Sequence, residues 1–151
     1  MRARMSSRRK QDGQAILESG LVMLIFLTVL IGIVDMGQYL YFHQSLTERA
    51  RAAARYGAVH TYTSPGLATQ NVAIYNDPAG AANGATALLP NLNTSAGANG
   101  YVSVILSGSG TEDARIIVTI NRYPFNFLGP YMSKSTWLRT TVASEPYEVL
   151  P

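Results

Sequence analysis

Residues 13–34 read GQAILESGLVMLIFLTVLIGIV, and this stretch decides the fold. Between residues 19 and 34 no side chain is charged, and only Ser19 and Thr28 are neither apolar nor glycine. A helix rises 1.5 Å per residue, so these residues cover about 24 Å of a bilayer core that is roughly 30 Å thick. Aromatic residues at 39, 41 and 42 suit a membrane–water boundary. The stretch therefore predicts a transmembrane helix over about residues 19–42.

The basic residues of the chain gather in front of this segment. Residues 1–13 carry a net charge of +4, although the whole chain carries only +3, so residues 14–151 are close to neutral at −1. The positive-inside rule predicts that residues 1–13 form a basic cytoplasmic leader and that the C-terminal part lies on the other side of the membrane. A nucleic-acid-binding domain would carry its basic residues on the folded body, so this class is excluded.

The predicted helix continues beyond the membrane segment. From Gln14 to about residue 57 there is no proline, and SLTERARAAARYGA (45–58) is rich in strong helix formers. Leucine, alanine and glycine recur every three or four residues at 46, 50, 53, 54 and 57, which gives a face suited to close packing. We therefore predict one helix over 14–57, retained after synthesis, because no small-x-small signal peptidase site directly follows the apolar run.

The rest of the chain predicts a helix-and-loop connection over 58–100 and a sheet region over 101–151. Ser64 and Pro65 indicate the start of a short second helix that ends at Asp77-Pro78. Alternating or β-branched residues then predict strands over 101–106, 114–123 and 135–145, arranged as an antiparallel meander. The sheet needs a cover for its apolar face, and the emerging half of the long helix can supply it. The predicted class is α+β.

Several kinds of chemistry have no support in the sequence. There is no cysteine, so disulfides, thiolate metal sites and cysteine nucleophiles are excluded. His43 and His60 lack metal-ligand spacing, and GSG at 108–110 lacks the strand–helix context of a dinucleotide site. We therefore expect no metal, no cofactor and no enzymatic activity.

Three motifs stand out along the chain: GQAILESG (13–20), IGIVDMGQYLYFHQSLTERARAAARYGA (31–58) and, more loosely, IIVTINRYPF (116–125). Together they resemble the TadE-like family of minor pilins (pseudopilins) of Flp/Tad-type type IV pili. The resemblance implies a type IV pilin-like fold and insertion into a bacterial inner membrane. It also implies cleavage between Gly13 and Gln14 by a prepilin peptidase, and contacts with other pilin subunits and the pilus assembly platform for pilus biogenesis, adhesion or secretion.

Two residues depart from the pattern of related pilins. Ser19 follows the glutamate, where Flp-type pilins usually carry an aromatic residue, and the new N-terminus would be Gln14 in place of phenylalanine. These departures bear on whether the protein is a major or a minor subunit more than on its processing.

Two acidic residues in the apolar helix are candidate assembly sites. Cleavage would create a protonated α-amine on Gln14 about 6 Å along the axis from Glu18. A carboxylate in a low-dielectric helix bundle needs a partner, and the amine of a neighbouring subunit can supply it. Asp35 raises the same question about 25 Å further on. It either makes a structural or assembly contact or reaches the headgroup region.

A second function from another class stays open at this point. An uncleaved single-pass membrane protein with an extracytoplasmic binding domain has the same apolar segment. A membrane-anchored enzyme is a third possibility, although the sequence contains no catalytic constellation. The mass of the membrane-extracted chain distinguishes the first two, because only a processed pilin loses residues 1–13.

Overall fold

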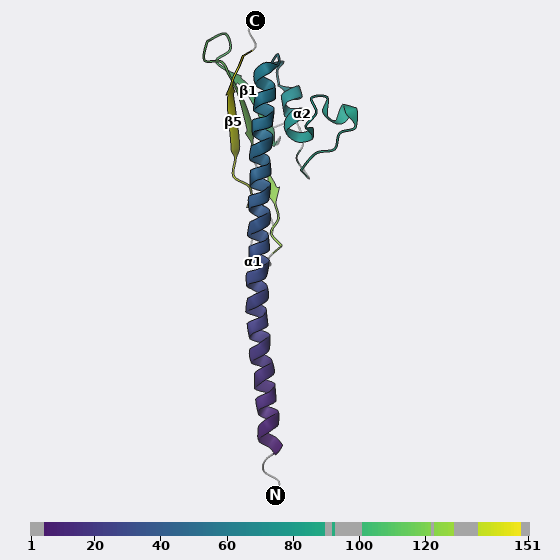
Figure 1. Ribbon diagram of the computed structural model, residues 1–151, viewed down its shortest axis with the longest axis vertical. Helices are drawn as coiled ribbons and strands as arrows, with labels where there is room; N and C mark the ends of the chain where they lie inside the picture. Colours follow the sequence, from purple (N-terminus) through teal and green to yellow (C-terminus); the bar gives the residue numbers. More distant parts are fainter. Residues whose placement is uncertain (1–4, 90–91, 93–100, 122, 129–135, 149–151) are drawn as a thin grey trace.

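The computed structural model describes residues 5–89, 92, 101–121, 123–128 and 136–148. One helix, α1 (Met5–Val59), runs almost the full length of the molecule, and the other elements gather around its C-terminal part (Figure 1). These are the helix α2 (Leu67–Tyr75), the 3-10 turn η1 (Gly80–Asn83) and the strands β1 (Val102–Ser107), β2 (Arg115–Ile120), β3 (Pro124–Phe125), β4 (Thr136–Trp137) and β5 (Thr141–Pro146). The predicted α+β class is confirmed.

The helix α1 is bare over its first half. From Gly13 to Leu30 every described side chain is exposed, and burial begins only near Ile31. By length and composition, α1 is the one helix among the described residues that could cross a membrane, and no other described part of the chain covers its most apolar window. Thr28, a polar residue inside that window, donates its hydroxyl to the Leu24 carbonyl at 2.8 Å, which satisfies it within the helix.

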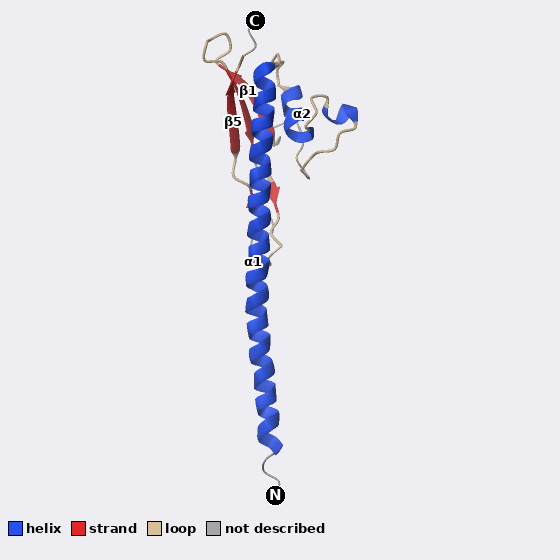
Figure 2. Ribbon diagram, viewed as in Figure 1, coloured by secondary structure: helices blue, strands red, loops and turns tan. Residues whose placement is uncertain are grey.

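The sheet is a three-stranded antiparallel meander in the order β1-β2-β5 (Figure 2). Val104 pairs with Val118, which in turn pairs with Ala143. One face of the sheet packs on α1 through β2 and β5, while α2 packs on α1 and touches β1. The predicted cover of the sheet by the emerging half of α1 is therefore correct.

The core is built on the small-residue face of α1. Leu46, Ala50, Ala53 and Ala54 are at most 1% exposed, and they meet Ile116, Val118 and Ile120 of β2. Gly57 lies so close to Ile116 and Thr69 that a Cβ would come within 3.1 Å of each. Small side chains on this face let the helix and the sheet approach closely, as their spacing in the sequence predicted.

Three details differ from the sequence predictions. The helix α1 already begins at Met5, because residues 5–12 contain no proline and are mostly good helix formers. The cap of α2 is Gly66 in the left-handed conformation, with no side-chain capping bond. The third predicted strand is divided into β4 and β5 around Leu138, whose amide bonds to the Tyr123 carbonyl at 3.0 Å, outside the main sheet.

Candidate functional site

The predicted processing site lies on the bare half of α1. Gly13 and Gln14 are exposed, and a Cβ added to Gly13 would meet nothing within 4 Å. A glycine inside a helix lowers its stability by roughly 1 kcal/mol relative to alanine, so the helix opens more easily here than at its neighbours. A protease that needs an extended backbone therefore meets an accessible and locally weak point.

Glu18 is also exposed, one turn beyond Gln14 on the same helix. Seventeen residues separate it from Asp35, which at about 100° per residue puts the two carboxylates roughly 100° apart around the helix axis. The two predicted assembly residues therefore point in different directions. Glu18 faces outward from the molecule, on a surface that another subunit could reach.

Asp35 has a different environment, because it is buried against its own chain. Its side chain is only 3% exposed, and its Oδ1 accepts a hydrogen bond from the Leu128 backbone N–H at 2.9 Å. Leu128 lies 93 residues further along the sequence. A buried carboxylate at this depth is stabilised by such a donor. Its role as a contact between subunits stays a prediction.

Leu128 belongs to a short segment that we call the strap, residues 123–128. The strap follows β2 and runs beside α1 below the sheet, toward the bare half of the helix (Figure 1, light green). It contains β3, which pairs with β4 in a separate two-stranded ladder. The strap thus extends the packing on α1 beyond the main sheet, down to Asp35.

Aromatic rings fill the space between the strap and α1. Tyr39 lies edge-on to Phe125 at a centroid distance of 5.7 Å and stacks on Phe127 at 6.4 Å. Phe42 contacts Tyr123 and Phe125 at 5.9 and 5.7 Å. Burial raises the pKa of the Tyr123 hydroxyl above its usual value, with a smaller contribution from Tyr101, so this ring stays neutral in the cluster. Contacts between the rings of α1 and those of the strap therefore hold the strap against the helix.

The sequence analysis missed the strap, although one signal could have pointed to it. Asp35 stands in phase with the packing face of α1, since positions 35, 39, 42, 46, 50, 53 and 57 follow one another at three- or four-residue intervals. An acidic residue on that stripe faces the chain's own core. The partner on the strap had no comparable signal.

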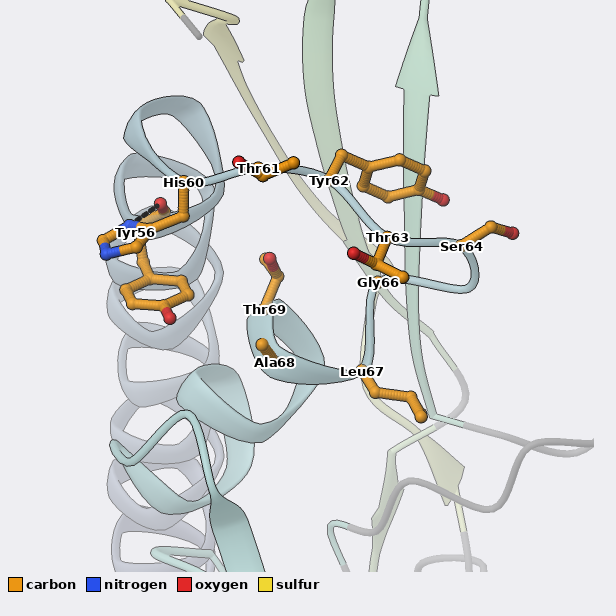
Figure 3. Close-up of a pocket in the computed structure, with 10 residues that line it drawn as sticks. All are labelled: Tyr56, His60, Thr61, Tyr62, Thr63, Ser64, Gly66, Leu67, Ala68 and Thr69. Atoms are coloured by element: carbon orange, nitrogen blue, oxygen red, sulfur yellow. Dashed lines mark hydrogen bonds between the residues drawn. The ribbon is translucent and has the colours of Figure 1, made fainter.

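A small pocket opens at the far end of α1, away from both acidic residues. Tyr56 and His60 stack at 3.9 Å on one side of it, Tyr62 and Ser64 lie on the other, and Thr69 lies between them (Figure 3). Its volume is about 140 Å³. Sites for small molecules usually measure roughly 300–1,000 Å³, so the pocket does not favour a ligand-binding function. Within the described residues no group of histidines and carboxylates could hold a metal ion.

Comparison with known proteins identifies the bare helix and its continuation as a family segment. Residues 13–55 match the family model described as TadE-like protein. No curated protein and no solved structure matches the chain. The resemblance drawn from the motifs is therefore confirmed for the segment that starts at Gly13 and includes Glu18 and Asp35. This segment is therefore similar to TadE-like proteins, and its apolar helix is long enough to anchor the chain in a membrane.

Proposed function

We propose that this protein is a minor pilin of a Tad-type pilus, made as an inner-membrane precursor with residues 1–13 in the cytoplasm. A prepilin peptidase cuts it between Gly13 and Gln14, and the shortened helix then joins other pilin subunits at the assembly platform. The observation that carries the proposal is the match to the TadE-like family model. The matched segment begins at Gly13. The mature chain serves pilus biogenesis, and through it adhesion or secretion.

The bare half of α1 supports assembly through the helix. Its apolar side chains are exposed from Ile16 to Leu30, so no contact with the described part of its own chain competes with lipid or with neighbouring helices. Glu18 lies on this surface, where the new α-amine of a second subunit can approach it. In a low-dielectric bundle this pair favours one axial register of the subunits over others.

Processing is tested by a matched pair of glycine variants. Gly13 and Gly20 are both helical and exposed, and neither has an atom within 4 Å of an added Cβ. Gly13→Leu should block removal of residues 1–13 in cells with active prepilin peptidase, whereas Gly20→Leu should be processed like the natural chain. Intact mass of the extracted protein reports both. Equal processing of the two variants would contradict the proposed cleavage site.

A further inference from the structure

We infer that the tip of the strap, Phe127 and Leu128, is a lipid contact that packs against the acyl chains of the outer leaflet. The inference goes beyond subunit assembly and rests on one part of the proposed function, the insertion of α1 into the membrane. The observations that carry it are the depth of Asp35, the exposed apolar surface beside it and the hydrogen bond to the strap.

The depth of the strap follows from the length of the helix. Counted from Ser19, the first residue after Glu18, Asp35 lies about 24 Å along the axis. A hydrocarbon core is roughly 30 Å thick, so Asp35 lies about 6 Å inside its outer boundary. Tilting the helix moves Asp35 deeper still. Because the Leu128 amide is 2.9 Å from Oδ1 of Asp35, the end of the strap lies at this depth too.

The surface at this depth is apolar and open. The Leu128 side chain is 71% exposed, and on α1 the neighbouring Met36 is 55% exposed. Ile33, at a similar depth on another side of α1, is 69% exposed, so the helix is apolar around the level of Asp35. In sequence, residues 123–133 carry no charge, and the charged residues that flank them are Arg122 and Lys134. Lipid acyl chains match this surface in chemistry and in position.

Part of the hydrogen bonding of the strap also fits a lipid environment. Irregular backbone is tolerated at membrane depth only where its polar groups are satisfied within the protein. Asp35 accepts from the Leu128 amide, and β3 pairs with β4. The aromatic rings that hold the strap, Tyr39 and Phe125 among them, suit the interfacial region where the strap enters the membrane. Asp35 thus acts as a positioning residue for a lipid-facing loop.

Spin labels on single cysteines test the inference, and the cysteine-free chain gives no background labelling. The full chain is reconstituted at a high lipid-to-protein ratio in vesicles of phosphatidylcholine and phosphatidylglycerol. Labels are placed at Leu128, at Met36 on the helix, at Val22 in the inner part of the apolar segment and at Ile105, which is 56% exposed on β1. Collisions with oxygen, which dissolves in lipid, are compared with collisions with a water-soluble nickel complex.

Leu128→Cys should give the same oxygen-over-nickel preference as Met36→Cys, whereas Ile105→Cys should give the opposite preference. If Leu128 behaves like Ile105 while Val22 lies in lipid, the inference is overturned and membrane insertion stands. If Val22 is also exposed to nickel, insertion fails and the inference fails with it. A Leu128 label shielded from both reagents would show a covering protein, such as a second copy of the chain, and would overturn the lipid contact.

Discussion

Glu18 is the residue through which one subunit would recognise the next. Its carboxylate is exposed on a bare apolar helix, so its environment is set by whatever surrounds that helix and not by its own fold. In lipid or in a helix bundle an unpaired carboxylate is costly, which makes the amine of a neighbour an effective partner. We therefore propose that Glu18 acts only after cleavage and only between subunits.

Replacing Glu18 should separate assembly from insertion. We expect Glu18→Gln to insert and to be processed normally but to co-purify with other pilins at least tenfold less, because the new amine then lacks a charged partner. Glu48→Gln is the matched control, since Glu48 is an exposed acid on the outer part of the same helix. Affinity purification of tagged subunits measures the effect. Unchanged recovery of the Glu18 variant would refute the pairing.

Asp35 acts within the chain, and its contact can be probed directly. Asp35→Ala leaves the Leu128 amide without its acceptor, a loss of about 1–3 kcal/mol. Hydrogen exchange of that amide should then accelerate roughly 5- to 150-fold in detergent micelles. Asp35→Asn keeps an oxygen acceptor and should retain most of the protection. The contact would have no effect on the strap if Asp35→Ala exchanged as slowly as the natural chain.

The two acidic residues also show how far sequence reasoning reaches at this scale. Both were predicted as functional because carboxylates in an apolar helix need partners. The structure adds that they face different directions and that Asp35 meets Leu128. That partner could not be predicted, because a contact across 93 residues with a backbone amide has no sequence signature.

Among the elements, the turn between α1 and α2 packs closely on β1. Gly66 has a φ of +76°, and a Cβ there would lie 3.0 Å from Tyr62 and from Val104 of β1. Gly84 has nearly the same φ, +74°, with nothing within 4 Å. The two glycines therefore share a backbone requirement but differ in crowding.

This difference gives a stability prediction. Gly84→Ala should lower the free energy of unfolding by about 1–2 kcal/mol, the usual cost of a left-handed residue other than glycine. Gly66→Ala should lower it by about 1–3 kcal/mol more, because the added methyl overpacks the contact with β1. Denaturant unfolding followed by circular dichroism measures both. If both variants lost the same free energy of unfolding, Tyr62 and Val104 would accommodate the added methyl without a loss of stability, which would contradict the prediction.

At the scale of elements, strong periodicity was predictable and short irregular pairings were not. The continuous helix follows from apolar and small residues that recur every three or four positions along α1. The meander follows from apolar residues that alternate with polar ones in the strands. The break between β4 and β5 arises because Leu138 bonds to Tyr123 on the strap. The alternating pattern over 135–145 contains no signal that a residue from a distant part of the chain would take one of its backbone hydrogen bonds.

In the whole molecule, one helix serves two environments. Its first half presents apolar side chains outward, and its second half forms a wall of the core. Contacts at the top fix the second half, where the Glu148 amide bonds to the Ala58 carbonyl at 2.9 Å and the Tyr147 hydroxyl accepts from the Tyr62 amide at the same distance. We therefore expect that the part of the chain that follows α1 cannot fold without the second half of this helix.

Two truncated chains test this dependence. A fragment of residues 35–151 keeps the whole packing face of α1 and should unfold cooperatively. A fragment of residues 51–151 lacks Leu46 and the rings of Tyr39 and Phe42, and a single buried leucine already contributes about 1.5–3 kcal/mol. Since domains are stable by only about 5–15 kcal/mol, the shorter fragment should show no cooperative transition. Thermal unfolding of both checks the claim, and equal cooperativity would refute it.

The central claim is that this chain is a processed pilin, and intact mass tests it most directly. The protein is extracted from membranes of cells that contain active prepilin peptidase and of cells that lack it. The account predicts a chain that begins at Gln14 in the first case and a chain that retains residues 1–13 in the second. A full-length chain in both would contradict it and would support an uncleaved single-pass membrane protein.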